Sequence, residues 1–466
     1  MKRKIILWIY GLITLSFISC SNYLDIKPYG KTIPKTSEEF SALLHTWLNE
    51  IDGGIDEALV GNSSVLLNMD GAYGDDFEVC LTSQNGRLMN VYIGNLVGTI
   101  AASRQYSTYY EIIRDCNIVL GEMEESGTAE AGEVRATAYA MRAVAYYQLL
   151  RFYCEVPQIG NFENQLGVPL VMTFDMEERP IRSTMQETID LIESDLNHSL
   201  SYHMKNDLYR FTEDVVKGYL ARLYFWTKQW GKALPLAQEL LTKYGLLKGD
   251  AYKNMMSTSY DLVGNQLLKS YRTTVDITEI TASKTYLQYR PVSKRFLNAF
   301  TEEEKVSDIR YALWVNNKRI AIKTFFCGMR IAEFKLMEAE CYYHLDKPEL
   351  ALRSINELRA HRINDYKDLE MDNLPSLQDT EIIVTDAEGN ALTPLMGLIL
   401  RERRKELFLE GDRFFEQKRN GMPEYWTAYN GRKYVTQKYM YTLPISPREI
   451  ELVDGLIQNP GYTELK

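Results

Sequence analysis

The chain has 466 residues and a formal net charge of −10. A protein this acidic repels the phosphates of nucleic acids, so we expect no DNA or RNA partner. No Pro-, Gly- or Ser-rich linker and no low-complexity run divides the chain. We therefore expect residues 20–466 to form one packed domain, with an N-terminal part over about 20–325 and a C-terminal part over about 326–466.

The first twenty residues have the pattern of a bacterial lipoprotein export signal. A basic start at residues 2–4 precedes an apolar run from Ile5 to Ile18, which is too short for a comfortable transmembrane helix. Because a small residue and then Cys20 end this run, we expect residues 1–19 to be removed and Cys20 to be acylated. The alternative is an ordinary secretory signal with an incidental cysteine. Several acyl chains would attach the protein durably to a membrane.

The cysteine pattern does not favour a disulfide framework. Once Cys20 is acylated, the other five cysteines cannot all pair, and no CxxC motif occurs. Cys116 and Cys341 fall inside helical patterns, where a thiol usually behaves as a small buried hydrophobe. The pairing state is left open for Cys80, Cys116, Cys154, Cys327 and Cys341.

Helical periodicity dominates the chain, and we expect a mainly α fold with long irregular loops and a few short strands. The loops are expected around residues 65–100, 245–325 and 365–392, which lack this period. Helices are predicted over 106–123, 133–153, 184–200, 212–227, 231–244, 330–344, 348–362 and 394–410.

An internal repeat relates three of these helices. A shift of 118 residues places Ala221 on Ala339 and Tyr224 on Tyr342, and a shift of 78 residues in the other direction places Ala221 on Ala143. Small residues where helices approach closely, with aromatic residues one turn away, are typical of tetratricopeptide-like helix pairs. We therefore predict a scaffold of packed helical hairpins with loops inserted between them.

A search for catalytic or metal-binding patterns finds none. The histidines show no metal-ligand spacing, and neither HExxH, GxSxG nor an EF-hand loop is present. The segment Arg401–Arg413 (RERRKELFLEGDR) could be imagined as acid/base carboxylates oriented by guanidinium groups. We favour a structural ion-pair network that docks the last helix and the C-terminal tail.

Short motifs in a fixed order carry a family resemblance. They run from Asn22-Tyr23-Leu24-Asp25 through the segments 142–157, 167–170, 182–196 and 332–359 to RERRKELFLEGDR, and end with Gln458-Asn459-Pro460-Gly461-Tyr462. In this order the chain resembles the SusD/RagB family of outer-membrane nutrient-binding lipoproteins of Bacteroidetes-type bacteria. The sharpest match is RERRKELFLEGDR, which is similar to the family's "ERR-x-E, EG-R" signature.

The resemblance implies a binding protein with no catalytic residue, cofactor or metal. Such a protein sits on the cell surface, held in the outer membrane by its lipid anchor. It captures oligosaccharides and delivers them to a SusC-like TonB-dependent transporter. Two alternatives stay open, namely a peptide-binding member of the same family and a helical-repeat scaffold whose partner is another protein.

The ligand site is expected on loops, because aromatic faces stack on sugar rings and nearby polar groups bond hydroxyls. The resemblance places such a site in two regions, about 65–100 and 270–320. Asp75 and Phe77 lie in the first region without being part of the predicted site. The predicted site residues are Tyr73, Asp76, Arg87, Asn90, Tyr92, Tyr286, Tyr289, Arg290 and Trp314. Because the first region is poor in Trp, a peptide or a small branched glycan also remains open.

Overall fold

The protein is mainly α-helical, as predicted, in a computed structural model of the chain. None of the helices that the model describes is long and apolar enough to cross a membrane. Three short antiparallel strand pairs accompany the helices. The described residues are 34–78, 105–124, 127–175, 177–273, 278–429 and 432–462.

All eight helices predicted from periodicity are present, with ends within four residues of the expected positions. Good agreement follows from their length, because three or more turns give the hydrophobic period enough repeats to be read. They are α5 (Gln105–Glu122), α6 (Ala129–Tyr153), α7 (Met185–Ser201), α8 (Glu213–Trp226), α9 (Trp230–Tyr244), α15 (Ile331–His344), α16 (Pro348–Ala360) and α17 (Pro394–Glu406).

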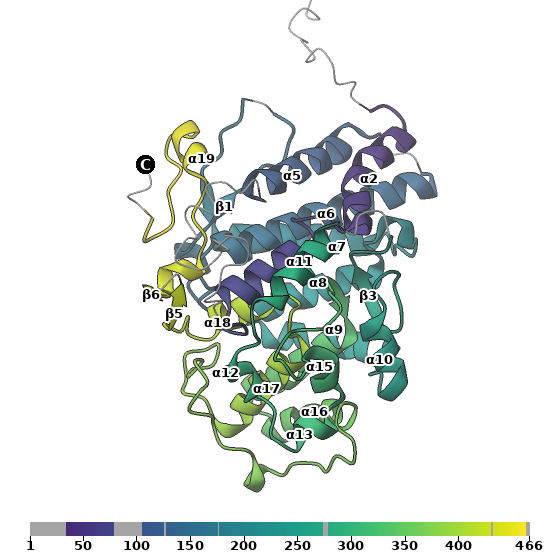
Figure 1. Cartoon of the computed structure of the whole chain (residues 1–466). Helices are drawn as coiled ribbons and strands as arrows, with labels where there is room; N and C mark the ends of the chain where they lie inside the picture. Colours follow the sequence, from purple (N-terminus) through teal and green to yellow (C-terminus); the bar gives the residue numbers. More distant parts are fainter. Residues whose placement is uncertain are drawn as a thin grey trace, which may run out of the picture.

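These helices stack in chain order as a ladder. Each of α5 to α8 packs against the next helix, α9 packs against α15, and α15 packs against α16 and α17. Figure 1 shows the order from α5 at the top, through α8 and α9, to α15 and α16 at the bottom. The residues between α9 and α15 are therefore an insertion into a continuous helical stack.

The predicted repeat is confirmed at the turns inside two helix pairs. Between α8 and α9 the left-handed residue is Lys228, with φ of 60°, and between α15 and α16 it is Asp346, with φ of 58°. The amide after each turn residue donates to the matching tyrosine carbonyl, Gln229 to Tyr224 at 2.8 Å and Lys347 to Tyr342 at 2.9 Å. The same backbone closure at two places 118 residues apart identifies one structural unit used twice.

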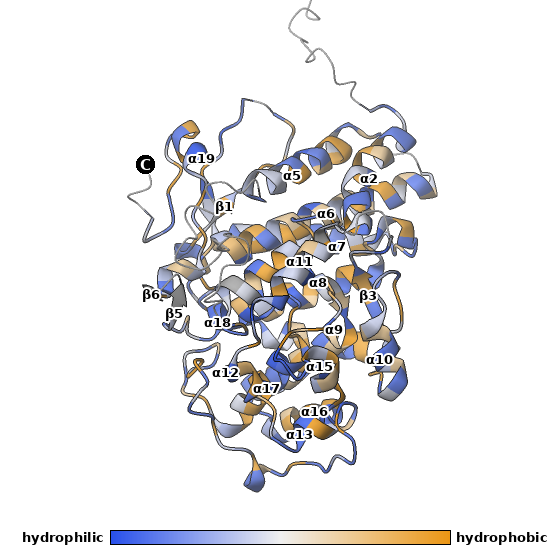
Figure 2. Ribbon diagram, viewed as in Figure 1, coloured by the Kyte–Doolittle hydropathy of each residue, from blue (hydrophilic) through white to orange (hydrophobic). Residues whose placement is uncertain are grey.

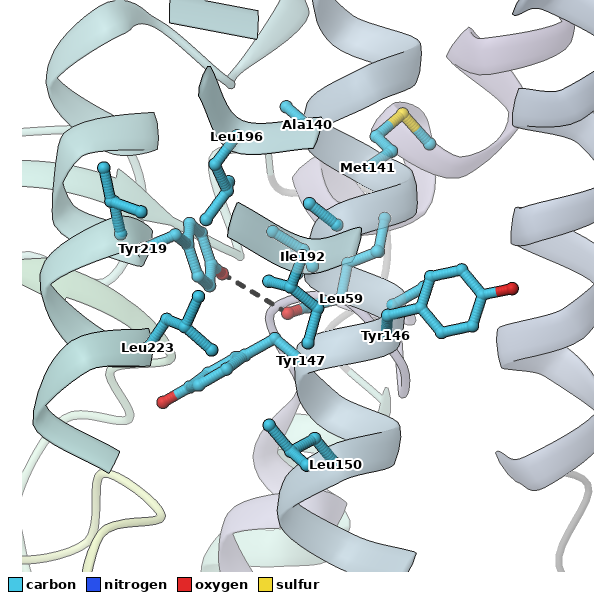
Figure 3. Packing of buried hydrophobic residues seen from close by; sticks show 14 of the residues in the cluster. Leu59, Ala140, Met141, Tyr146, Tyr147, Leu150, Ile192, Leu196, Tyr219 and Leu223 are labelled. Atoms are coloured by element: carbon cyan, nitrogen blue, oxygen red, sulfur yellow. Dashed lines mark hydrogen bonds between the residues drawn. The ribbon is translucent and has the colours of Figure 1, made fainter. Parts of the chain in front are cut away.

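Helix α6 lies at the centre of the largest apolar core. Alanines, tyrosines and leucines are buried around most of its circumference, whereas most other helices show hydrophobic and hydrophilic sides (Figure 2). In Figure 3 side chains of α6 meet Ile192 and Leu196 of α7 and Tyr219 of α8. The Tyr219 hydroxyl donates to the Leu59 carbonyl at 3.4 Å, so a loop residue also belongs to this core.

The four described cysteines, Cys116, Cys154, Cys327 and Cys341, are all buried. Cys116 and Cys341 sit within helices with no exposed surface, which confirms their prediction as small buried hydrophobes. Burial raises the pKa of both thiols. Cys20 and Cys80 lie outside the described residues.

The prediction of a long loop over 245–325 is wrong, because five helices lie there. Each is eleven residues or shorter, so few apolar positions repeat and periodicity gives a weak signal. The segment around 365–392 is irregular as expected, apart from one 3-10 turn. The five helices are α10 (Gly249–Ser257), α11 (Thr278–Gln288), α12 (Lys294–Leu297), α13 (Glu304–Ser307) and α14 (Ile309–Trp314).

Helix α2 (Ser37–Gly53) was not predicted, although the sequence contains its signals. Thr36 and Glu39 form a capping box, and Phe40, Leu44 and Leu48 are buried at a spacing of four. The other elements are α3 (Ser63–Leu66), the π-helical segment η2 (Leu67–Tyr73), α18 (Arg413–Arg419), α19 (Pro447–Leu452) and the strands β1 (Leu166–Pro169), β2 (Arg182–Thr184), β3 (Gln266–Lys269), β4 (Gly328–Arg330), β5 (Trp426–Tyr429) and β6 (Arg432–Val435).

Candidate functional site

The two loop regions predicted to carry the ligand site lie side by side. Phe77 and Val292 form an antiparallel bridge, and the amide of Glu78 donates to the Pro291 carbonyl at 2.8 Å. The Ser293 hydroxyl donates to the carbonyl of Asp75 at 2.7 Å. Residues more than 200 positions apart are thus joined by main-chain hydrogen bonds, which fix the relative position of both regions.

Trp314 offers no surface in this structure on which a sugar ring could stack, and its role as a ligand residue stays a prediction. The side chain has no exposed surface. Its indole N–H donates to the carbonyl of Lys405 at 2.9 Å, and the Lys323 ammonium lies 4.4 Å from the ring centroid. The apolar surface of this tryptophan packs inside the core, and its single N–H already has a hydrogen-bond acceptor there.

Three further predicted residues are also core residues. Tyr73 and Tyr286 are buried, and Arg290 is 8% exposed. A guanidinium N–H of Arg290 donates to the Tyr286 hydroxyl at 2.5 Å, and its Nε donates to the Glu78 carbonyl at 3.3 Å. These groups stabilise the junction of the two loop regions, and they offer little surface to a ligand. Tyr289 is half-buried.

Asp76 is buried beneath the loops with one carboxylate oxygen held by Arg404, so it too is a structural residue. Its carboxylate accepts from Arg404 at 2.8 Å, and the neighbouring Asp75 accepts from Arg413 at 2.7 Å. Burial raises the pKa of Asp76 to about 6, a rise to which the charge of Asp75 adds and which Arg404 and Arg413 only partly offset. For Asp75, burial acts in the same direction, but Arg404 and Arg413 outweigh it and lower the pKa.

The RERRKELFLEGDR segment forms the structural ion-pair network that was predicted. Glu406 has no exposed side-chain surface and accepts from Arg310, Arg330 and Arg362 at 2.6 to 3.2 Å. Glu402 accepts from Arg310 at 2.7 Å. Despite the opposing effect of burial, these cations hold the pKa of both glutamates well below the usual range.

The partners of this network differ from those expected. It joins α17 and α18 to residues 75–76 and to the insertion, through Arg404 and Arg310. The C-terminal tail is held elsewhere: the Asn459 side chain accepts from Arg182 at 2.7 Å and donates to the Tyr153 carbonyl at 2.8 Å. The prediction that this network docks the C-terminal tail is therefore wrong, because the tail packs against the C-terminal end of α6.

We name the exposed and half-buried side chains of these two regions and of the β5–β6 hairpin the loop surface, namely Glu78, Tyr289, Lys294, Arg319 and Trp426. Glu78 accepts from the Lys294 amide at 3.2 Å and from Arg319 at 2.5 Å. Trp426 is 55% exposed. Its neighbour Tyr425 donates to the Tyr73 carbonyl at 2.8 Å, and the Arg295 guanidinium lies 5.7 Å from the Tyr425 ring.

Sequence reasoning missed Trp426, although a signal for it exists. Asn430 and Gly431 stand between two β-prone runs, which is the strongest short-range hairpin pattern. Strand alternation then puts Tyr425 and Trp426 on opposite faces, so burial of one exposes the other. Lys433 on β6 lies with its ammonium 5.5 Å from the Trp426 ring centroid. The hairpin is seen at the left edge of Figure 1.

The remaining predicted residues cannot be placed. Arg87, Asn90 and Tyr92, together with the lipidation site Cys20, lie outside the described residues. Within the described part of the chain, no group of three or more His, Cys, Asp or Glu side chains is arranged to hold a metal ion.

The fold and the loop surface define a helical-repeat protein whose loops and β5–β6 hairpin present an exposed aromatic ring and charged groups. Two family models match the chain. The model described as "SusD family" matches residues 304–462, and the model described as "Starch-binding associating with outer membrane" matches residues 22–225. The chain belongs to the SusD/RagB family.

Solved structures share this fold at low sequence identity. A SusD superfamily protein from Bacteroides fragilis has a TM-score of 0.68 and 20% identity, and the match covers 91% of this chain and 100% of that chain. One from Bacteroides thetaiotaomicron has a TM-score of 0.67 and 19% identity, with 91% and 100% covered. A "Laminarin binding SusD-like protein" has a TM-score of 0.61 and 17% identity, with 92% and 100% covered. The search of curated proteins found no match.

Proposed function

We propose that this protein is a cell-surface lipoprotein that captures oligosaccharide and delivers it to a SusC-like TonB-dependent transporter. Membership of the SusD family supports the binding role, and the description of the matched model supports association with the outer membrane. The signal pattern ending at Cys20 supports a lipid anchor facing the cell exterior. The proposed role needs no catalytic group.

The observation that carries the proposal is the exposed indole of Trp426 on the β5–β6 hairpin, with the Lys433 ammonium near its ring. Sugar rings stack on flat aromatic faces, and carboxylate and guanidinium groups bond their hydroxyls. Trp426 supplies such a face, and Glu78 with Arg319 supplies bonding groups held in place by their own ion pair. We therefore place the glycan at the loop surface.

The test is isothermal titration of the chain from Ser21 onward against a panel of dietary and host glycans. We expect at least one glycan to bind, and Trp426→Ala to weaken that binding about tenfold because a ring stack is lost. Phe174→Ala is the matched control, since Phe174 is 39% exposed on the connection between β1 and β2.

Two outcomes contradict this assignment. If no glycan binds, oligosaccharide capture is wrong. If Trp426→Ala and Phe174→Ala bind as well as the unchanged chain, the site is not at the loop surface. Co-purification with a SusC-like transporter from the same organism tests delivery to the transporter separately.

Peptide capture is the second candidate, and charge favours it. Lys294, Arg319 and Glu78 bring two cations and a carboxylate to the loop surface, and such groups suit peptide termini and charged side chains as well as hydroxyls. A mixed peptide pool in the same titration distinguishes the two. Binding of peptides alone would replace the glycan assignment.

A further inference from the structure

Two adjoining cavities lie inside the helical stack, away from the loop surface. The outer cavity has a volume of about 90 Å³ and the inner one about 40 Å³, so together they have room for a small acidic group and a few waters and not for a whole drug-sized ligand. Arg151, Arg222, Glu333, Asp412 and Phe415 line both, so the two are continuous. Tyr219 and Leu59, whose hydrogen bond is drawn in Figure 3, belong to the wall of the outer cavity.

Polar atoms without a hydrogen-bond partner gather around these cavities. Among the described residues they include Gln148 Oε1, Arg151 Nε, Trp226 Nε1, Arg403 Nη1 and Glu416 Oε1. Trp226, Arg403 and Glu416 are each more than nine-tenths buried and line the inner cavity. Because buried polar atoms are normally paired, three donors and two acceptors around one space indicate a polar occupant.

The charges of the lining arginines single out one of them. Arg222 pairs with Glu333 at 2.6 Å, Arg403 with Asp412 at 2.5 Å, and Arg419 with Glu340 at 3.0 Å. Within the described part of the chain, Arg151 has no carboxylate within ion-pair distance. Its guanidinium lies 3.5 Å from the Phe415 ring centroid and donates to the Tyr147 hydroxyl at 3.2 Å.

We propose that Arg151 binds the carboxylate of a small ligand that enters the outer cavity. A half-buried guanidinium is stabilised by a counter-ion, and its planar fork matches a carboxylate in two parallel hydrogen bonds. Gln148 Oε1 is placed to accept a hydroxyl or ammonium proton from the same ligand. Acidic monosaccharides and amino acids or other small organic acids share this chemistry.

The carboxylates in the outer cavity do not prevent anion binding. Glu333 and Asp412 are paired with Arg222 and Arg403, and Glu410 accepts from Lys323 and Arg330. The remaining lining carboxylate, Glu57, is exposed, so solvent screens its charge.

The rim of the outer cavity is preformed. The Asp56 carboxylate accepts from four consecutive amides, those of residues 58–61, at 2.7 to 3.0 Å. This loop therefore holds its shape at the mouth before any ligand arrives, and the cost of ordering it on binding is avoided.

This second site is independent of the proposed glycan site. The loop-surface residues do not line either cavity. Glycan binding that depends on Trp426 and carboxylate binding that depends on Arg151 are measured separately, so either assignment can fail alone.

The test is isothermal titration of the chain from Ser21 onward with glucuronate, glucose, acetate, succinate and glutamate. Glucuronate and glucose differ by the carboxylate, so we expect the first to bind and the second not to bind at this site. Binding of acetate, succinate or glutamate without glucuronate identifies an organic acid or amino acid, and the reverse identifies an acidic sugar.

Variants locate the site. Arg151→Met should weaken carboxylate binding at least tenfold, and Arg151→Lys, which keeps the charge without the planar fork, should weaken it less. Arg135→Met is the matched control, since Arg135 is also half-buried on α6 but lines neither cavity. Urea unfolding of each variant checks that it is folded. If Arg151→Met does not fold, the carboxylate binding measured for Arg151→Lys tests the proposal.

Three results overturn the proposal. They are no binding by any of the carboxylates, equal binding of glucose and glucuronate, and unchanged binding in both Arg151 variants. A loss in Arg135→Met as large as that in Arg151→Met would also overturn it.

Discussion

Glu406 shows how much one buried carboxylate can organise. Its two oxygens accept from three arginines of three different segments, and Tyr252 donates to it at 3.3 Å. Three guanidinium groups around one anion are stable only while that charge is present. The residue therefore acts as a structural centre and is unavailable for chemistry.

We expect Glu406→Gln to lower the free energy of unfolding by about 3–5 kcal/mol, because the buried arginines lose their counter-charge. The measurement is urea unfolding followed by circular dichroism. Glu302→Gln is the control, since the Glu302 side chain is 88% exposed in its pair with Lys305, and it should change stability by less than about 0.5 kcal/mol. Equal effects of the two changes would contradict a structural role for Glu406.

Two buried glutamates should give opposite dependences of stability on pH. Burial acts to raise the pKa of Glu340, but Arg419 outweighs it and lowers the pKa to about 2. Glu340 therefore stabilises the fold above about pH 4.5, and this contribution is lost as the pH falls from 4.5 towards 2. Burial raises the pKa of Glu416 to about 7. The folded state then holds a proton that the unfolded state releases, so stability falls as the pH rises from 4.5 to 7.

The measurement is the urea midpoint of each variant between pH 3 and 8. Relative to the unchanged chain, Glu340→Gln should be most destabilising near pH 6 and lose this effect towards pH 3. The stability of Glu416→Gln should rise relative to that of the unchanged chain as the pH rises through 7. Parallel curves for the two variants would contradict these assignments.

Individual site residues were harder to predict than their neighbourhood. The sequence indicated that residues 65–100 and 270–320 both contribute to the ligand site. The described parts of the two regions do contact each other. Burial of Trp314 and Asp76 could not be read from the sequence, because it depends on Lys405 and Arg404, more than 90 positions away. Trp426 was predictable in principle from the Asn430-Gly431 turn and strand alternation.

At the level of elements, the turns of the repeat carry a backbone cost that can be measured. Asp346 has φ of 58° and an exposed side chain, and glycine adopts this conformation without steric conflict. Asp346→Gly should therefore stabilise the protein by about 0.5–1 kcal/mol, and Asp346→Val should destabilise it by about 1–2 kcal/mol.

Lys347→Gly is the control for this prediction. Lys347 has φ of −125°, so glycine there only adds freedom to the unfolded chain and should destabilise the protein. Thermal unfolding of the three variants gives the comparison. A destabilised Asp346→Gly variant would contradict a left-handed turn at this position.

Elements were predictable where their pattern was long. Helices of thirteen residues or more were found from periodicity, with the exception of α2. The short helices α12, α13 and α14 span at most six residues each, too few for an apolar period to repeat. They form because the ionic network and the second apolar core, which contains Phe296, Phe300 and Trp314, hold them.

For the whole molecule, the prediction of one packed domain over residues 20–466 stays a prediction, and long-range contacts support it. Arg404 and Arg413 of the C-terminal part pair with Asp75 of the N-terminal part. Helix α9 packs on α15 across the insertion, and β3 pairs with β4 at its base.

We expect a chain cut inside the insertion to remain assembled. A protease site placed between Asn317 and Lys318, both exposed in a turn, would give two fragments joined only by noncovalent contacts. After cleavage they should elute together on size exclusion, and separate in urea. Separation in buffer alone would contradict one packed domain.

The direct packing of α9 on α15 has an evolutionary consequence. Because the ladder closes without residues 245–330, this insertion can gain or lose segments while the stack keeps its geometry. Lineages are then free to vary the parts of this interval that do not contact Glu406, and to inherit the ladder unchanged.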